Sequence, residues 1–520
     1  MNKSMKLKCT LGIILLLMAL QLKAETYNIK ELGADTKGQV KCTELINQTI
    51  QKAAEAGGGT IYFPAGTYLT GAITMQSNIT LQIEAGATLS FSTDFDDYLP
   101  FREVRWEGIF MQTFSPLIYA KGAENIAIKG EGTLEGNGKA WWEEVKKQQY
   151  KVYADGSILQ PNKFQQMWLD QNADLKVEKY YEKSLQHRFF RPPFIQFQEC
   201  NHVTIEGVTI QNSPFWTVNP VGCDDLLVHG IKIKNPDDGW NTDGINPSSC
   251  SNLRVSDCFI SVGDDCVTIK SGRDFNGRDY GKPCENITIT NCIMLSGHGG
   301  VVIGSEMSGG VRNVAISNCV FNGTDAGIRL KASRGRGGVV ENIRVENIVM
   351  RNISKNAFIF NLFYDKTSTP EPVTERTPVF RNVHISNVTG VDVNKVGFIT
   401  GIEEMPVNEI SFSNINMTAK EGFTAETATN LHFNNISIAT EKGPSLSFTK
   451  CDGVVLNDVR SMAPLADQAI VEVKESKSVL VNNCFQTVPA DVFLQTDDSD
   501  VVWGTNFMNA VKQGIQNNDK

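Results

Sequence analysis

Short runs of alternating hydrophobic and polar residues recur over most of the chain. The runs that begin at Asn252, Asn286 and Asn313 read Asn-Leu-Arg-Val-Ser-Asp-Cys, Asn-Ile-Thr-Ile-Thr-Asn-Cys and Asn-Val-Ala-Ile-Ser-Asn-Cys. An apolar side chain at every second position is typical of a strand with one buried face. Gly, Asn and Asp residues follow the runs and favour turns. The pattern therefore predicts many short strands joined by turns, with little helix between them.

Copies of this run follow one another at intervals of 21 to 40 residues, which indicates stacked repeats. Each copy starts with an anchor residue, and the anchors are His202, Asp225, Asn252, Asn286, Asn313, Asn342, Asn382, Glu409, Asn430, Gly453 and Ser478. Leucine-rich repeats need their own leucine spacing, and ankyrin or TPR arrays need helices. We therefore expect an all-β fold, a right-handed parallel β-helix, whose equivalent residues stack roughly 4.7 to 4.9 Å apart.

Residues 1–24 have the pattern of a secretory signal peptide. Lysines precede the apolar run from Leu11 to Leu20, and Ala24 offers a small residue for cleavage. The run is too short to favour a membrane span. We expect a protein exported to the periplasm or the cell exterior, with residues 25–520 as one β-helix catalytic domain.

Two segments of that domain depart from the repeat. Residues 43–56 place Ile46, Ile50 and Ala53 on one face of a predicted helix, which we expect to cap the first rung. Residues 139–191 interrupt the repeat with charged and aromatic residues and read as an insertion. We interpret the insertion as a solvated excursion packed on the solenoid rather than as a direct substrate contact.

Charge and cysteine content narrow the classes of partner. Removal of residues 1–24 takes four lysines and no acids, so the net charge changes from −9 to −13. An acidic surface argues against nucleic acid as a partner. There is no Cys-x-x-Cys pair, which argues against a zinc site. Cys258, Cys292 and Cys319 share one repeat position and are expected to stack as buried hydrophobes, while disulfide pairing stays open.

Four polar clusters stand at the ends of apolar runs within residues 241–331. They are Asn241-Thr242-Asp243-Gly244, Gly263-Asp264-Asp265, Gly297-His298-Gly299 and Arg329-Leu330-Lys331. Asp264 and His298 both lie 12 residues after the anchor of their repeat (264 − 252 and 298 − 286). They should therefore be vertical neighbours in the β-helix, and four consecutive rungs should contribute to one site.

Three neighbouring carboxylates suit acid and base catalysis, because mutual repulsion and burial raise one pKa while the others stay ionised. Cleavage of a glycosidic bond needs such an acid and a base. Asp clusters also bind calcium, but Arg329 and Lys331 would repel a cation. Together with Arg334 and Arg336, they place four cations in eight residues. We expect these four to form a local positive site for an anionic substrate.

The four clusters, in this order on a β-helix, resemble the signature motifs of the glycoside hydrolase family that contains the polygalacturonases. The resemblance implies cofactor-free hydrolysis of α-1,4 bonds between galacturonic acids of pectin, with inversion. By resemblance Asp264 matches the general acid, Asp243 and Asp265 the pair that activates water, and His298 the assisting imidazole. Asn241 belongs to the first motif and is predicted to bind substrate. Arg329 and Lys331 match the residues that hold the galacturonate carboxylate.

Several expectations follow from this resemblance. Inversion leads us to expect carboxyl groups roughly 6.5 to 9.5 Å apart. The insertion can wall off one end of the cleft, so we favour exo action on a pectic polysaccharide or oligogalacturonide by a monomer. An endo-polygalacturonase or rhamnogalacturonan hydrolase of the same family remains the alternative. From other classes, a calcium-dependent pectate lyase and a non-catalytic glycan-binding β-helix remain open.

Overall fold

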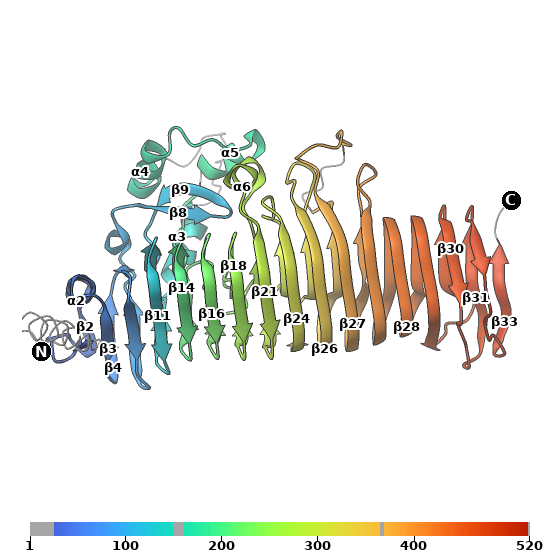
Figure 1. Ribbon diagram of the computed structural model, residues 1–520, viewed down its shortest axis with the longest axis horizontal. Coiled ribbons are helices and arrows are strands. Elements are labelled where there is room, and N and C mark those ends of the chain that lie inside the picture. Colours follow the sequence, from blue (N-terminus) through green and yellow to red (C-terminus); the bar gives the residue numbers. More distant parts are fainter. Residues whose placement is uncertain (1–24, 149–160, 187, 365–368, 518–520) are drawn as a thin grey trace, which may run out of the picture.

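Successive repeats stack as parallel strands along one axis, and the result is a right-handed parallel β-helix (Figure 1). The computed structural model describes residues 25–148, 161–186, 188–364 and 369–517. The expected signal peptide lies outside these residues. The predicted fold class is confirmed.

The strands of each rung fall into three columns. The first column contains β1 (Glu25–Asn28), β3 (Gly59–Phe63), β6 (Ile79–Ile83), β11 (Glu124–Gly130), β14 (Asn201–Glu206), β16 (Asp224–His229), β18 (Ser251–Ser256) and β21 (Cys284–Thr290). The second contains β2 (Lys37–Lys41), β4 (Gly66–Thr70), β7 (Ala87–Phe91), β12 (Thr133–Glu135), β15 (Thr209–Gln211), β17 (Lys232–Lys234), β19 (Phe259–Ser261) and β22 (Ile293–Ser296). The third contains β5 (Ile73–Thr74), β10 (Ile118–Lys121), β13 (Ile195–Gln198), β20 (Asp265–Ile269), β23 (Gly299–Gly304) and β25 (Ala326–Lys331).

Toward the C-terminus the strands lengthen and pass from one column into the next. These longer strands are β24 (Val311–Asn322), β26 (Val339–Asn361), β27 (Val379–Thr400) and β28 (Val407–Ala463). The last rungs contain β29 (Ala469–Lys474), β30 (Lys477–Asn482), β31 (Ala490–Asp497), β32 (Val501–Trp503) and β33 (Val511–Asn517). Strands of the three columns pair in parallel with their equivalents in the next rung, so position in the repeat fixes position along the column.

The anchor residues have a conformational role. All eleven have positive φ values, between 50° for Asp225 and 74° for Gly453. This left-handed conformation favours Asn and Gly over other residues. The amides of Asn286, Asn313 and Asn342 also donate to the side-chain oxygen of the Asn one rung earlier, at 3.2, 3.0 and 3.1 Å. The repeated Asn therefore turns the chain and joins neighbouring rungs.

The interior of the solenoid is filled by the apolar residues of the repeat. Leu253, Ile287, Val314 and Ile343 occupy one column and are buried. The eleven cysteines of the described part of the chain are buried and free. They pack as small apolar side chains, as predicted for Cys258 and its equivalents.

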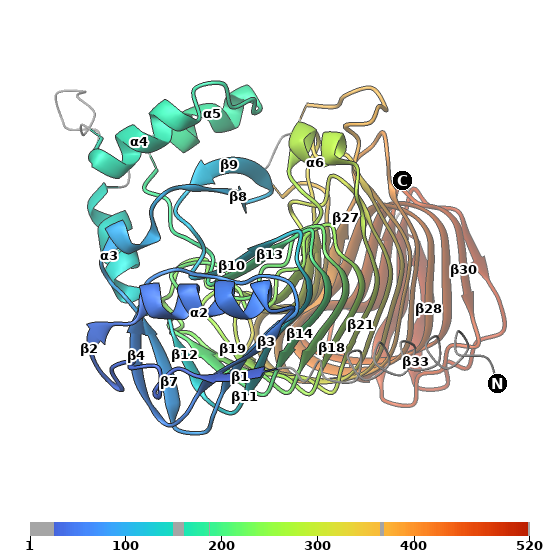
Figure 2. The ribbon, with the colours of Figure 1, turned by 60° about the vertical axis from the view of Figure 1, so that its left-hand side comes forward.

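A helix covers the N-terminal end of the core. This helix, α2 (Thr43–Glu55), buries Ile46, Thr49, Ile50 and Ala53, and Figure 2 shows it lying across the first rungs. The predicted cap is confirmed. Within the described residues, no helix has both the length and the apolar character that a membrane crossing requires.

The excursions gather beside the third column of strands. The insertion contains α3 (Lys139–Gln148), α4 (Lys163–Gln171) and α5 (Lys179–Gln186). Next to it lie the 3₁₀ turn η1 (Phe95–Tyr98), the antiparallel hairpin of β8 (Arg102–Trp106) and β9 (Ile109–Thr113), and the short helix α6 (Asp274–Tyr280). The repeat pattern did not predict the hairpin or α6. Together they overhang one face of the solenoid (Figure 2).

Candidate active site

The four polar clusters meet on the outer face of the third column, as their place in the repeat predicts. Asp265 pairs in register with Gly299, and Arg329 with Val302 one rung earlier. The backbone N–H of His298 donates to the Asp264 carbonyl at 2.9 Å, so these two residues are vertical neighbours. All seven predicted site residues line one of two adjoining cavities.

The three carboxylates are closer together than expected. One oxygen each of Asp243, Asp264 and Asp265 lies within 4.8 Å of the other two. The expectation of roughly 6.5 to 9.5 Å, the separation usual for inverting enzymes, is therefore wrong for these oxygens. The side chains of the three aspartates converge toward one point across adjacent rungs. The expectation instead added the length of the side chains to the spacing between the rungs.

Asp243 is almost completely buried. Its Oδ2 accepts hydrogen bonds from Asn246 Nδ2 at 3.0 Å and from Thr268 Oγ1 at 3.3 Å. Burial and then the negative charge of Asp264 raise the pKa of Asp243 well above its usual range. Its Oδ1 and the Oδ1 of Asp265 accept no hydrogen bond from the described residues. Each of these two oxygens can accept a hydrogen bond from a water molecule.

Asp264 and His298 form a charged pair. His298 Nδ1 lies 3.3 Å from Asp264 Oδ1, and Asn241 Nδ2 lies 3.4 Å from Oδ2. Burial raises the pKa of Asp264, but the bond to His298 and the charge of Lys331 outweigh it and lower the pKa to about 2. The same bond raises the pKa of His298. Below the raised pKa of His298, the proton of the pair therefore lies on the imidazole.

The two cations occupy different positions. Lys331 is buried, and its Nζ lies 2.8 Å from Asp265 Oδ2. Arg329 is more exposed, at 21%, and its Nη1 lies 3.7 Å from Asp265 Oδ1. Tyr364 lies beside both, with its ring centre 5.5 Å from the guanidinium and 5.3 Å from the ammonium. Lys331 thus neutralises a carboxylate of the trio, and Arg329 is better placed to reach a ligand.

Arg334 and Arg336 do not belong to the cleft, so the expectation of a four-cation site is wrong. Arg334 pairs with Glu404 at 2.8 Å, and Arg336 pairs with Asp274 at 2.6 Å. Neither lines the cavities that contain the carboxylates. The chain turns away from the cleft after β25. Both guanidinium groups bind carboxylates of segments that lie outside the repeat.

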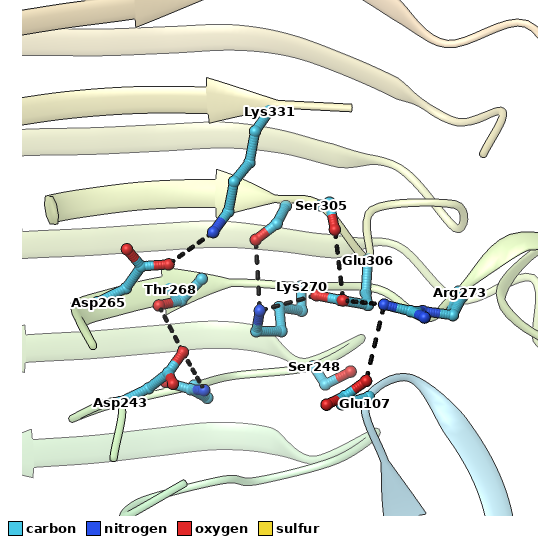
Figure 3. A network of polar contacts seen from close by, with 12 residues as sticks. Glu107, Asp243, Ser248, Asp265, Thr268, Lys270, Arg273, Ser305, Glu306 and Lys331 are labelled. Carbon is cyan, nitrogen blue, oxygen red and sulfur yellow. Dashed lines mark hydrogen bonds and ion pairs between the residues drawn. The ribbon is translucent and has the colours of Figure 1, made fainter. Parts of the chain in front are cut away.

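A second buried charge cluster lies beside the carboxylates (Figure 3). Glu306 accepts hydrogen bonds from Lys270 Nζ and Arg273 Nη2, both at 2.8 Å. Lys270 also lies over the Trp216 ring, 4.6 Å from its centre. The positive charge of Lys270 lowers the pKa of both Asp243 and Asp264. Lys270 and Glu306 were not predicted as site residues, because neither belongs to a recognised motif.

Arg191, at the end of the insertion, was also missed. Its Nη2 donates to Asn241 Oδ1 at 2.8 Å, and its Nη1 donates to the Pro214 carbonyl at 3.0 Å. Burial lowers the pKa of Arg191 to about 10. The bond fixes the Asn241 amide so that its nitrogen points at Asp264. The insertion, interpreted from the sequence as a solvated excursion packed on the solenoid, therefore also contributes to the site.

The two cavities meet at the carboxylates and form one cleft. The larger, about 800 Å³, is lined on one side by Trp106, Lys146, Arg188 and Phe189 from the hairpin and the insertion. The smaller, about 360 Å³, contains Arg329, Lys331 and Tyr364. Both are lined by Glu107, Asn241, Asp264 and His298. A ligand that spans both cavities passes directly over Asp264.

The carboxylate trio also has the donor set of a small cation site. Its surroundings do not suit one, because Lys331 already contacts Asp265 at 2.8 Å and Arg329 lies close by. The raised pKa of Asp243 likewise favours a proton over a metal ion at that position. The arrangement is better suited to proton transfer.

Comparison with known proteins places this site in a family. Residues 166–431, just over half of the chain, match the family described as Glycosyl hydrolases family 28. Residues 26–153 match the family described as Rhamnogalacturonase A/epimerase, pectate lyase-like. All seven predicted site residues lie within the first of these matches.

Individual relatives agree with this assignment. The chain is 29% identical to a probable polygalacturonase from Vitis vinifera over 76% of this chain and 75% of the relative. It is 28% identical to an endo-polygalacturonase from Pectobacterium carotovorum subsp. carotovorum over 79% of this chain and 94% of the relative. The crystal structure of an exopolygalacturonase from Thermotoga maritima is 34% identical and covers 80% of this chain and 93% of its own, with a TM-score of 0.67. The protein is therefore a member of family 28 of the glycosyl hydrolases.

Proposed function

We propose that this glycosyl hydrolase cleaves α-1,4 bonds between galacturonic acid residues of pectin, beginning at a chain end. The observation that carries the proposal is one cleft in which three carboxylates meet a cationic pair. The carboxylates supply acid and base groups for a glycosidic bond. The cations Arg329 and Lys331 suit a substrate with a carboxylate on each sugar.

In this proposal, substrate binding places one proton on Asp264. Lys331 is among the groups that lower the pKa of Asp264, and a bound galacturonate carboxylate weakens that effect by neutralising the cation. Protonation of Asp264 then removes a charge that, after burial, raises the pKa of Asp243. The pKa of Asp243 falls, so its ionised form, which can accept a proton from water, is favoured. A neutral acid and ionised bases thus coexist in one cleft.

The bond-breaking step follows from these states. Asp264 donates its proton to the glycosidic oxygen as the bond to the anomeric carbon breaks. Asp243 and Asp265 accept the proton of the attacking water molecule, which adds to the same carbon. The water-derived proton then leaves Asp243 or Asp265 to solvent, and one proton from solvent returns to Asp264 through its hydrogen-bonded partner His298, which restores the starting state. No cofactor enters this sequence.

Inversion at the anomeric carbon is part of the proposal through the family resemblance. The nearest oxygens of the trio are within 4.8 Å, so their separation does not by itself favour inversion. Proton NMR of the first product decides the matter, because inversion of an α linkage releases the β anomer. Initial appearance of the α anomer would contradict this part of the proposal.

The walls of the larger cavity favour action at chain ends. Residues of α3 and of the segment after α5 line the cavity on the side away from Arg329. The Thermotoga maritima relative is named an exopolygalacturonase and the Pectobacterium relative an endo-polygalacturonase. Digestion of unesterified polygalacturonate, with separation of early products, tests the mode. We expect galacturonate monomer, whereas an early ladder of trimers and tetramers would contradict exo action.

The alternatives predict other products. A rhamnogalacturonan hydrolase would act on rhamnogalacturonan in preference to polygalacturonate. A lyase would release an unsaturated, ultraviolet-absorbing product and would need calcium. A glycan-binding β-helix would bind without turnover.

We further propose that the protein is exported to the periplasm or the cell exterior and acts as a monomer.

A further inference from the structure

The helix α5 forms part of the support of the cleft wall. Figure 1 and Figure 2 show it above the solenoid, close to α6. Its eight residues, Lys179–Gln186, are too few for a helix that is stable alone in water, so contacts with other elements set its place. Arg188 and Phe189, shortly after its end, line the larger cavity. The contacts that hold α5 therefore also hold this wall.

One such contact joins α5 to the hairpin. The hydroxyl of Tyr181 donates to Glu107 Oε2, in the turn between β8 and β9. The Tyr181 ring lies against the Arg273 guanidinium, 4.0 Å from ring centre to Cζ. Glu107 also accepts a hydrogen bond from Arg188 Nη1 at 3.0 Å. Tyr181, the hairpin turn and the cavity-lining Arg188 are thus linked through one largely buried carboxylate.

The neighbouring residue joins α5 to a different element. The hydroxyl of Tyr180 donates to Asp274 Oδ2 at 2.5 Å and accepts from Arg336 Nη1 at 2.8 Å. Asp274 is the first residue of α6 and is buried. Two adjacent tyrosines therefore attach α5 to the hairpin through Glu107 and to α6 through Asp274.

The hairpin itself is firmly fixed, so it is a suitable anchor. The backbone N–H of Arg273 donates to the Gly108 carbonyl at 3.2 Å. A Cβ on Gly108 would lie 2.7 Å from that backbone nitrogen, and its φ of 86° also favours glycine. Trp106 stacks on Phe215 with ring centres 4.9 Å apart. The wall is thus held by the tyrosine contacts together with the bond of Arg188 to Glu107 and the packing of Phe189 against Phe95, with ring centres 5.4 Å apart.

We propose that Tyr180 and Tyr181 are specificity-determining residues, whose hydroxyls dock α5 against the hairpin and α6 and thereby restrict cleavage to chain ends. This inference rests on the proposed function. The two side chains touch neither the carboxylate trio nor Arg329, so they act by positioning the wall. With α5 undocked, the larger cavity opens and the interior of a polymer can lie across Asp264.

The test is the double variant Tyr180→Phe/Tyr181→Phe, which keeps both rings and removes only the two hydroxyls. Each lost hydrogen bond to an ionised carboxylate lowers the ratio of docked to undocked α5 by roughly tenfold or more. We expect oligomers larger than the monomer among the early products of polygalacturonate. We also expect a faster fall in viscosity than in the wild type at equal numbers of new reducing ends.

The matched control is Tyr27→Phe, because the Tyr27 hydroxyl also donates to a carboxylate, Glu25 Oε2, at 2.9 Å in β1. This control should retain monomer as the early product. If the double variant releases monomer alone, or only melts at lower temperature with unchanged products, the inference is overturned. An oligomer ladder from the wild type would instead contradict the proposed exo action, so the two failures are distinguishable.

Discussion

Arg191 Nη2 lies 2.8 Å from Asn241 Oδ1, and through this contact the insertion orients a residue of the catalytic cleft. The bond leaves the amide nitrogen of Asn241 facing Asp264 Oδ2 at 3.4 Å. Arg191 donates to Asn241 and to the backbone carbonyls of Pro214 and Trp240 rather than to the three carboxylates, so its role is to position Asn241. Arg191 of the insertion and Asn241 of the first motif thus act together as one unit.

The first prediction concerns this unit. Arg191→Met removes the donor and frees the Asn241 amide to rotate, so we expect kcat on polygalacturonate to fall by roughly tenfold. Asn241→Ala should cost a similar factor, and the double variant little more, because both changes break one chain of contacts. Steady-state kinetics of the three variants measures this. Fully additive losses would show that the two residues act separately.

The second prediction separates the roles of the two cations. Arg329→Ala should raise KM by roughly tenfold or more with a smaller change in kcat, because it removes a contact to the substrate carboxylate. Lys331→Met should lower kcat, because it leaves the buried Asp265 without its partner at 2.8 Å. Kinetics on unesterified polygalacturonate tests both. Equal changes in KM and kcat for the two variants would contradict these separate roles, substrate binding for Arg329 and neutralisation of Asp265 for Lys331.

The third prediction is a pH dependence. The bond to Asp264 raises the pKa of His298, so its proton is present at low pH and is lost as pH rises through that raised value. The alkaline limb of kcat/KM should therefore lie above about 6.5, the ordinary histidine value. In His298→Asn the proton is held by carboxyl groups alone, so this limb should move to lower pH. If the alkaline limb of kcat/KM stays at the same pH in His298→Asn, His298 does not hold the proton that it shares with Asp264.

The fourth prediction concerns stability. Glu306 neutralises the buried Lys270 and Arg273, whose side chains are 5% and 11% exposed. Glu306→Ala should lower the free energy of unfolding by about 3–5 kcal/mol, because it leaves the buried Lys270 without its carboxylate and Arg273 with only Glu107, at 3.8 Å. Breaking the more exposed Arg312–Glu285 pair with Arg312→Ala should cost about 1 kcal/mol or less. Urea unfolding of both variants measures the difference, and equal losses would contradict it.

The repeat made most of the fold and the motif residues predictable. Asp264 and His298 share a repeat position. Residues at the same repeat position stack on one another in a parallel β-helix, and these two side chains are in contact. The anchor Asn residues were recognised as a pattern, although their left-handed conformation became evident only in the structure. A solenoid is favourable for such prediction because its contacts run between equivalent residues.

The remaining features depend on contacts outside the repeat. Glu107 and Tyr181 lie 74 residues apart and meet in the cleft wall, and no spacing rule connects them. Arg334 and Arg336 were assigned to the substrate on charge alone, but each contacts a carboxylate of another excursion. The carboxylate separation was misjudged because side-chain direction matters as much as rung spacing.

The central claim is that the carboxylate trio, beside the cationic pair, cleaves galacturonan. Its most direct test is the rate of reducing-end release from unesterified polygalacturonate by the wild type and by Asp264→Asn, with oligogalacturonide binding measured in parallel by calorimetry. We predict that the wild type releases reducing ends and that the variant loses roughly 10²-fold or more of that rate while still binding. Full activity in Asp264→Asn, or binding without release by the wild type, would contradict the claim.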